Sequence, residues 1–455
     1  MLQLDEQFVK SLSEIPGHER VIEALTTEPS PVCVRLNPAK SLREEIPAET
    51  RAVPWEPCGF YLEERPRFTF MPSLYDGRFY VQDASSMIVG EVVRRLCRDG
   101  QPLRVLDACA APGGKALSAL SALPEGSFVL ANEFKSDRIP ALADNLNRWG
   151  LPAFAVAAND ARRLHKLGAI FDIAVADVPC SGEGMMRKNE TAVTQWSPRL
   201  VAECASLQRE IVSSVWSTLR PGGYLVYSTC TFNTAENEDN VSWMVETLGA
   251  EPVDLNLTDY PGVCGPAKGL LPVARLMPGF VDGEGQFVAV LRKPSGAADD
   301  EPRIKKTKAV PALPDWINPG FAEFTDKTGR VFAFPEAHAD LMGHIMSKIH
   351  VAVPGTHIAN PKGRGLVPAH ALATSLALRN DVFPSVDVDY PTAIRFLQGN
   401  SIELPHGTPK GIVLIVHDGN RLGWVNNIGN RANNLVPNEC RIRSPYVPDS
   451  CPALF

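Results

Sequence analysis

The sequence predicts an α/β fold built on a doubly wound, mostly parallel sheet, with a small α+β region before it and a β-rich region after it. Short apolar runs alternate with segments of helical periodicity from residue 104 onward, as in parallel strands joined by crossover helices. Two of these runs, FDIAVADVPCS (171–181) and GYLVYSTCT (223–231), lead directly into a cysteine. In an open parallel sheet, reactive groups and ligands collect at the carboxyl ends of the strands. The chain of 455 residues is 44% hydrophobic and 21% charged, so it can bury several ordinary cores.

Residues 1–95 are predicted to form an N-terminal α+β domain. A helical start over residues 5–25 precedes a proline-rich extended part. The segment FYVQDASSM (79–87) is expected to be a strand that runs into a helix, because Asp83, Ser85 and Ser86 are favourable helix-capping residues.

Residues 96–295 are predicted to form the central domain. Its expected strands cover residues 104–108, 127–133, 153–160, 171–179 and 223–231, followed by a late antiparallel strand over 285–293. Its expected helices follow the CAAPGGK turn, cover residues 139–149, carry an apolar stripe from Leu200 to Leu219, and cover residues 233–248. Pro221, Gly222 and Gly223 are expected to end the long helix.

The rest of the chain divides into a linker at 296–315, an α+β intermediate domain at 316–390 and a β-rich domain at 391–455. The linker lacks periodicity and is rich in Pro, Lys and Ala. Residues 331–381 mix short helices with turns, and the strand-like runs 411–416 and 421–424 suggest a small barrel. We expect the chain up to about Pro311 to fold without this tail.

Composition narrows the classes of function. The net charge of -7 argues against a general polyanion binder, so a nucleic-acid partner must be held locally. Residues 331–455 hold ten basic and nine acidic side chains, net +1, which makes the tail relatively basic. The ten cysteines include no C-x-x-C pair, so no metal site is predicted. No apolar run approaches bilayer length and the first residues lack a signal-peptide pattern, so we expect a cytoplasmic protein without membrane contact. We also expect it to be a monomer.

The first strand-to-helix turn indicates a cofactor. Its residues, Cys109, Ala110, Ala111, Pro112, Gly113, Gly114 and Lys115, fit neither a dinucleotide fingerprint nor a P-loop. The glycines still allow backbone N–H groups at a helix N-terminus to approach an anion such as a carboxylate. Glu133 ends the second strand, where ribose hydroxyls bind in doubly wound folds, and Asp160 ends the third, where it can meet an adenine amino group. A ligand with a carboxylate, a ribose and an adenine but no phosphate is S-adenosylmethionine; the alternative is that both acids cap helices.

Cys180 and Cys230 are candidate reactive thiols. A free cysteine is usually a core residue. Both thiols, however, follow a completed strand and lie among Ser, Thr, Pro and Gly residues that favour a cleft. A thiol beside an S-adenosylmethionine site suggests carbon methylation, because cytosine C5 becomes nucleophilic only after a thiolate adds at C6.

Residues 79–293 resemble the Sun/Nop family of RNA (cytosine-5) methyltransferases through YVQDASSM, DACAAPGGK, DVPCSGEG and YSTCT. The resemblance implies a Rossmann-like class I methyltransferase fold. It also implies that Cys230 attacks C6, that Asp177 holds the base edge near N3 and N4, and that Cys180 assists product release. The implied cofactor-binding residues are Cys109 to Lys115, Glu133, Arg138, Asp160 and Asp177. Val178 stands where the family usually has alanine, and we expect this difference to change the local packing slightly without changing the role of any residue.

The flanks are similar to the RsmF group of bacterial small-subunit rRNA methyltransferases. The similarity rests on RLNP (35–38) and LGWVNNIGNRANNLVP (422–437). It implies a PUA-like RNA-binding domain at 391–455 and 16S rRNA or the small ribosomal subunit as partner.

Three other readings remain open. The substrate can be tRNA. A DNA cytosine-5 methyltransferase would use Cys180 as the attacking thiol, but Ser181 and Gly182 follow it where those enzymes have glutamine, and Cys230 would have no task. A non-catalytic RNA-binding assembly factor would tolerate loss of either thiol, and both are present.

Overall fold

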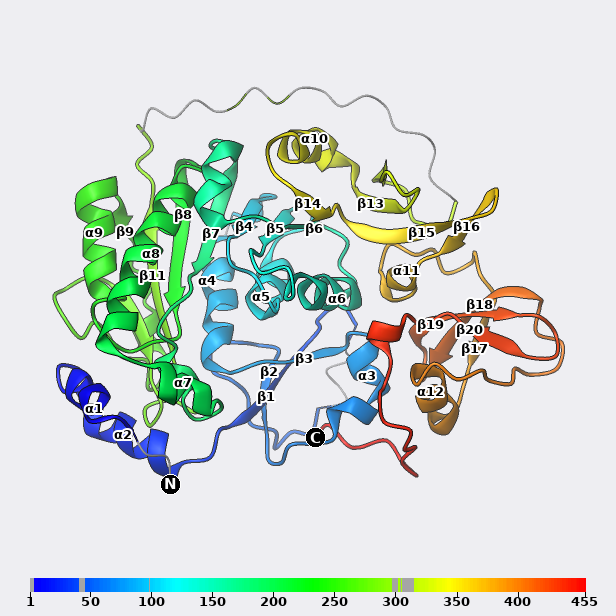
Figure 1. Ribbon diagram of the computed structural model, residues 1–455, viewed down its shortest axis with the longest axis horizontal. Helices are drawn as coiled ribbons and strands as arrows, with labels where there is room; N and C mark the ends of the chain where they lie inside the picture. Colours follow the sequence, from blue (N-terminus) through cyan, green and yellow to red (C-terminus); the bar gives the residue numbers. More distant parts are fainter. Residues whose placement is uncertain (1–3, 41–45, 98, 297–301, 303, 305–314) are drawn as a thin grey trace.

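The computed structural model describes residues 4–40, 46–97, 99–296, 302, 304 and 315–455. The main sheet lies at the centre of the molecule and has the strand order β10-β11-β8-β7-β4-β5-β6-β14, with β9 paired to β11 (Figure 1). Its parallel strands are β4 (Arg104–Asp107), β5 (Phe128–Asn132), β6 (Phe154–Ala157), β7 (Phe171–Asp177) and β8 (Leu219–Thr229). Antiparallel strands complete both edges: β9 (Glu251–Pro252), β10 (Val273–Leu276), β11 (Gln286–Arg292) and β14 (Val351–Val353).

This topology confirms the doubly wound sheet predicted from the sequence, including its late antiparallel strand. Strand order runs outward from β4 through β5 and β6 on one side and through β7 and β8 on the other. The direction of winding therefore reverses between β4 and β7. A ligand site is expected outside the carboxyl ends of the strands at this position.

Helices cover both faces of the main sheet. One face packs against α4 (Ile88–Leu96), α5 (Gly114–Ala122) and α6 (Ile139–Trp149). The other packs against η4 (Ala161–Leu167), α8 (Pro198–Trp216), α9 (Glu238–Leu248) and α10 (Ala339–Lys348). Neighbouring residues of one strand serve opposite cores: Val105 packs with Leu117, and Leu106 packs with Val215. Burial on both faces explains why these strands are continuous apolar runs in the sequence.

Two predicted boundaries in this region are wrong. The long helix ends at Trp216 and not at Leu219, because the Thr218 carbonyl already accepts the N–H groups of Ile170 and Phe171 at the start of β7. Leu219 therefore begins β8, and Pro221 to Gly223 lie inside that strand. The helix expected from Asn233 begins at Glu238, since the Asn233 N–H donates to Glu183 and the Glu236 N–H donates to the Asn233 side chain.

The N-terminal region is α+β, as predicted. Its helices are α1 (Glu6–Leu12), α2 (His18–Thr27), η2 (Phe68–Phe70), α3 (Pro72–Tyr75) and η3 (Ser85–Met87). Its sheet has the order β2-β1-β3 and consists of β1 (Val32–Leu36), β2 (Gly59–Leu62) and β3 (Phe79–Val81). The Asp83 carboxylate accepts the Ser86 N–H at 3.0 Å, which confirms its capping role before α4.

The C-terminal region contains two further sheets. The first has the order β12-β13-β15-β16, with β12 (Phe321–Thr325), β13 (Val331–Pro335), β15 (Thr356–Lys362) and β16 (Gly365–Pro368). The second has the order β17-β18-β19-β20, with β17 (Ser385–Asp387), β18 (Gly411–His417), β19 (Asn420–Asn427) and β20 (Ala432–Asn434). The accompanying helices are η7 (Glu336–His338), α11 (His370–Thr374), α12 (Tyr390–Leu397) and η8 (Asn438–Cys440).

The short helices expected over 331–381 are observed as η7, α10 and α11, and the same span also contains the strands β13, β14, β15 and β16. A small barrel is expected near the end of the chain. The strands there form the open sheet β17-β18-β19-β20, in which β17 does not pair with β20. The linker predicted at 296–315 lies almost entirely outside the described residues. None of the described helices is both long and apolar enough to cross a membrane.

The tail contributes to the main core, although the sequence leads us to expect that the chain up to about Pro311 folds without it. Leu341, Met342 and Ile345 of α10 are fully buried against the main sheet, and β14 extends that sheet by pairing with β6. The proposed domain limits therefore cross a shared sheet.

Lys40 joins three parts of the chain. Its buried ammonium donates to the carbonyl oxygens of Asp76 at 2.7 Å, Arg148 at 2.7 Å and Thr374 at 2.8 Å. Those carbonyls belong to the N-terminal region, α6 and α11. Burial lowers the pKa of Lys40 to about 8. One side chain thus links α11 of the tail to the N-terminal region and to α6.

Candidate active site

Two thiols meet at the carboxyl ends of β7 and β8. Cys180 lies in the loop after β7 (the first loop, residues 178–189), and Cys230 begins the loop after β8 (the second loop, residues 230–237). Their Sγ atoms are 3.3 Å apart, and both residues are partly exposed. The hydrogen bond with Cys230, followed by burial, raises the pKa of the Cys180 thiol well above its ordinary value. Cys180 therefore holds its proton at neutral pH.

Buried carboxylates lock the two loops together. Glu183 of the first loop accepts the N–H groups of Phe232 at 2.6 Å and Asn233 at 3.0 Å in the second loop. Glu236 of the second loop accepts the N–H of Ser181 in the first loop at 3.0 Å. A buried carboxylate is tolerated when hydrogen-bond donors surround it. The reciprocal pattern fixes the distance between the two sulfur atoms.

The loops also approach each other at Gly184, in the short helix η5 (Glu183–Met185). Its N–H donates to the Cys230 carbonyl at 2.8 Å. A Cβ at this position would lie 2.5 Å from the Glu284 carbonyl oxygen and 2.9 Å from that of Cys230. Only glycine allows this approach.

The Arg187 side chain is buried in an ion pair with Glu284, with 2.9 Å between Nε and Oε2. Arg187 is therefore a structural residue rather than a surface cation.

Asp177 lies beside the thiols as the last residue of β7. Its carboxylate is 3.0 Å from the Lys115 ammonium and accepts hydrogen bonds from Ser228 at 2.8 Å and Gln286 at 3.2 Å. Burial opposes a charged Lys115, but Asp177, and then the nearby Cys230 sulfur, raise the pKa of Lys115. An oriented, partly exposed carboxylate therefore stands next to the reactive pair.

The CAAPGGK turn joins β4 to α5, as predicted. Gly113 has φ +118°, a left-handed conformation that favours glycine, and precedes the first residue of α5. The Arg138 guanidinium donates to the Ala111 carbonyl, and its Nη1 lies 3.6 Å from Oε2 of Glu133. Glu133 directly follows β5, is 5% exposed, and accepts the Lys135 N–H at 2.8 Å. The predicted turn, Glu133 and Arg138 are thus brought together.

Asp160 takes the helix-cap role that the sequence also allowed. It lies three residues beyond the end of β6, and its carboxylate accepts the Arg162 N–H at 3.0 Å and pairs with Arg162 Nη2 at 2.7 Å. The hydrogen bonds from Arg162 lower the pKa of Asp160. Its contact with an adenine stays a prediction.

Sequence reasoning missed Asp107, at the carboxyl end of β4. The side chain is 1% exposed, and among the described residues its oxygens accept no hydrogen bond of ordinary geometry. Burial, and then the negative charge of Asp177, raise the pKa of Asp107 to about 7. The missed signal is simple: Asp107 ends a predicted strand with an acid, as Glu133 does.

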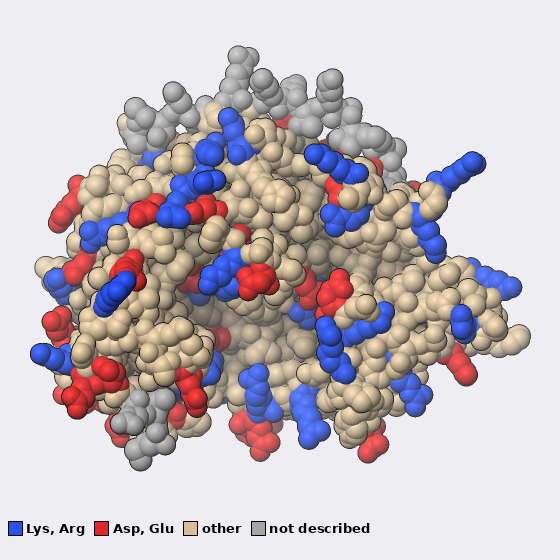
Figure 2. Space-filling view, in the orientation of Figure 1, with Lys and Arg blue, Asp and Glu red and all other residues tan. Residues whose placement is uncertain are grey.

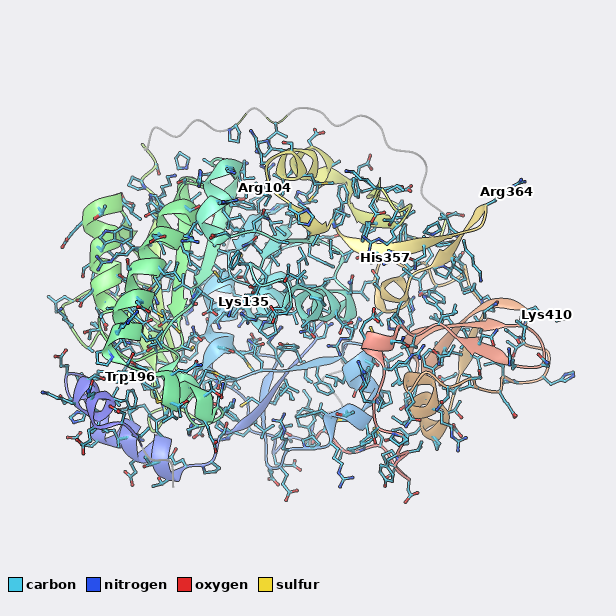
Figure 3. All side chains as sticks on the ribbon, in the orientation of Figure 1. Arg104, Lys135, Trp196, His357, Arg364 and Lys410 are labelled. Carbon is cyan, nitrogen blue, oxygen red and sulfur yellow. The ribbon has the colours of Figure 1, made fainter. Side chains whose placement is uncertain are left out.

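Phe134 was missed as well. It follows Glu133 directly and is 66% exposed, unusual for a phenylalanine ring. Figure 3 labels the next residue, Lys135, at the centre of the molecule where β5 ends, and Trp196 beside α7 (Glu190–Gln195). Figure 2 shows the surface recessed below the centre of this face.

The described residues contain no group of three or more His, Cys, Asp and Glu side chains placed to hold a metal ion.

Comparisons with known proteins agree with this geometry. Family models match three successive segments: the N-terminal domain of 16S rRNA methyltransferase RsmF at 4–84, 16S rRNA methyltransferase RsmB/F at 98–292, and the methyltransferase RsmF PUA domain at 383–442. Ribosomal RNA small subunit methyltransferase F of Shewanella loihica is 30% identical over 96% of each chain. The protein of that name from Cronobacter sakazakii is 31% identical over 85% of this chain and 84% of its own.

Solved structures share the fold. A methyltransferase homolog protein from Pyrococcus horikoshii is 27% identical, with a TM-score of 0.55 over 64% of this chain and 96% of its own. The crystal structure of NSun6 from Pyrococcus horikoshii with SFG is 20% identical, with a TM-score of 0.54 over 64% of this chain and 98% of its own.

Proposed function

Because the chain belongs to the ribosomal RNA small subunit methyltransferase F family, we propose that it transfers a methyl group from S-adenosylmethionine to C5 of a cytosine in RNA, with 16S rRNA as the substrate. The observation that carries this proposal is the pair of thiols 3.3 Å apart at the ends of β7 and β8. Methylation at a base nitrogen or a ribose oxygen needs no thiol. Methylation at C5 needs one to activate the ring.

The residues around the β4–β7 switch point fit S-adenosylmethionine, which supplies an electrophilic methyl group when bound. The buried carboxylate of Asp107 accepts no side-chain hydrogen bond among the described residues and suits the ammonium of the methionine part. The N-terminus of α5 suits the carboxylate of that part. Glu133 would accept the ribose hydroxyls, Arg138 would hold the turn through Ala111, and the exposed ring of Phe134 would stack on the adenine.

In the proposed reaction Cys230 is the nucleophile. After its thiol proton has passed to solvent, the Cys230 sulfur forms a bond to C6 of the cytosine, and the electron pair of the C5–C6 double bond moves toward C5, which then accepts the methyl group. Asp177 holds the base edge near N3 and N4, in an orientation set by Lys115 and Ser228. This division of roles rests on the place of Cys230 in the YSTCT motif, by which the chain resembles the family.

Cys180 would act in the second half of the reaction. Solvent water takes the C5 proton, the C5–C6 double bond re-forms, and the bond between C6 and the Cys230 sulfur breaks. The departing thiolate can accept a hydrogen bond from the Cys180 thiol, which lies at 3.3 Å in the free protein. That bond stabilises the leaving group and so assists product release.

The test is methyl transfer from labelled S-adenosylmethionine to 16S rRNA, tRNA and DNA, followed by mapping of the modified base. The proposal predicts 5-methylcytosine in 16S rRNA. Label in tRNA alone would keep the chemistry and change the substrate. Label in DNA, or on a nitrogen, would contradict the proposal.

A further inference from the structure

One end of the β12-β13-β15-β16 sheet carries unpaired positive charge. β15 and β16 form a hairpin whose tip holds Lys362, Gly363 and Arg364, all of them exposed. Figure 3 shows Arg364 extending away from the body of the molecule, at the end of this hairpin. Neither cation pairs with an acid in the part of the chain that the structure describes.

A second turn adds to this charge. The turn between β12 and β13 lies against the hairpin, since a Cβ on Gly329 would be 3.2 Å from the Pro361 ring. It carries Lys327 and Arg330, both exposed. Its single acid, Asp326, is occupied: Arg330 Nη2 lies 2.7 Å from Oδ2, and the Thr328 N–H donates to Oδ1 at 2.8 Å.

Together Lys327, Arg330, Lys362 and Arg364 form what we name the basic end of the sheet. Four cations and one carboxylate give a local charge of +3, in a chain whose net charge is -7. Figure 2 shows basic side chains on the right-hand edge of the view, where this hairpin lies. Concentrated cations on a projecting hairpin suit the phosphate backbone of a nucleic acid, because Lys and Arg gain affinity by releasing condensed counterions.

The basic end is connected through packed side chains to the rest of the tail and through β14 to the main sheet. Val331 and Ile358 of its strands share one core with Leu414 and Trp424 of the neighbouring sheet. The chain between β13 and β15 contributes β14 to the main sheet. A phosphate bound here would therefore lie on a surface that is joined to the sheet that carries the thiols.

We propose that the basic end binds the phosphate backbone of the RNA substrate, as a contact separate from the segment 383–442 that matches the PUA domain. This inference rests on the proposed function, because both take RNA as the substrate. It adds a binding surface made by residues 326–330 and 361–365, which none of the matched family segments covers.

The test uses the full chain with Lys362→Ala and Arg364→Ala combined. The control is Lys10→Ala, an exposed lysine on α1 at the opposite end of the molecule (Figure 1). Binding of a 16S rRNA transcript is measured at several salt concentrations. Each lost phosphate contact lowers the slope of log K against log salt by about 0.7 to 0.9, so the double variant should lose about 1.4 to 1.8. Affinity for S-adenosylmethionine should not change.

A slope and an affinity equal to those of Lys10→Ala would overturn the inference. So would weaker binding to assembled subunits with no change on naked RNA, which would indicate a protein contact. Methylation by the unchanged chain is measured on the same RNA. If that chain methylates cytosine and the double variant keeps its slope, only this inference fails. If the slope falls but no 5-methylcytosine forms, only the proposed function fails.

Discussion

The Sγ atoms of Cys180 and Cys230 lie 3.3 Å apart, although the residues are separated by 50 positions in the chain. They meet because β7 and β8 are neighbouring parallel strands that end at the same edge of the sheet. The hydrogen bond with Cys230, followed by burial, raises the pKa of Cys180, and either sulfur can donate that bond. The separate roles proposed for the two thiols are therefore tested with a variant of each.

Glu133→Ala should weaken the binding of S-adenosylmethionine while leaving the fold intact. A hydrogen bond to a charged group contributes about 1.5 to 3 kcal/mol, so the affinity should fall by about tenfold or more. Calorimetry measures it, with Glu203→Ala on the exposed face of α8 as the control. Unchanged affinity would remove Glu133 from the cofactor site.

Asp107→Asn should alter the pH dependence of stability in the absence of cofactor. The pKa of Asp107 is raised to about 7 by burial, whereas an unfolded carboxyl titrates near its ordinary value of about 3.9. The contribution of Asp107 to the free energy of unfolding is therefore fully present below about pH 4 and is lost as the pH rises through about 7. Removing the titrating group should remove this loss.

Urea unfolding of both proteins at pH 5 and pH 8 measures the effect. Asp107→Asn should be the more stable protein at pH 8 and should bind S-adenosylmethionine more weakly, because it cannot pair with an ammonium. Equal pH dependence in the two proteins would show that Asp107 does not titrate in this range.

Lys40→Met should destabilise the whole chain. The substitution leaves the buried carbonyls of Asp76, Arg148 and Thr374 without their donor. Leaving a buried acceptor unpaired costs about 1 to 3 kcal/mol, so a loss of at least that size is expected in the free energy of unfolding. Lys10→Met is the matched control. Denaturation curves that coincide would show that the three carbonyls find other partners.

Ending the chain at residue 315 should leave an unstable protein rather than an independent catalytic domain. The deletion removes Leu341, Met342 and Ile345 from the core, and each such side chain contributes about 1.5 to 3 kcal/mol when fully buried. It also removes β14 from the edge at β6. A truncated chain with full thermal stability and normal cofactor affinity would contradict the shared core.

Much of the site was predictable because it depends on strand ends. The alternation of apolar runs places the CAAPGGK turn, Glu133, Asp177 and both thiols at one edge of the sheet, which needs no knowledge of side-chain packing. Asp107 was accessible to the same reasoning. The sequence could not decide whether Asp160 caps a helix or contacts the cofactor. The outcome depends on where β6 ends, three residues before Asp160, and on the hydrogen bond from Arg162.

The remainder depends on contacts between distant segments. The exchange of Glu183 and Glu236 between the two loops has no local pattern, since each carboxylate accepts N–H groups about 50 residues away. The addition of β14 to the edge of the main sheet likewise cannot be predicted from a run as short as Val351–Val353. The basic end of the sheet required the pairing of β15 with β16 before its charges could be grouped.

The central claim is that Cys230 bonds to RNA and Cys180 assists its release. The direct measurement is a denaturing gel of each variant incubated with S-adenosylmethionine and 16S rRNA, with Cys451→Ala, an exposed cysteine near the chain end, as the control. Cys180→Ala should give a slow-moving protein–RNA band, because the adduct forms and is not resolved, and Cys230→Ala should give none. A band from Cys230→Ala alone would assign the attack to Cys180, and full methylation without a band in both variants would return both thiols to a structural role.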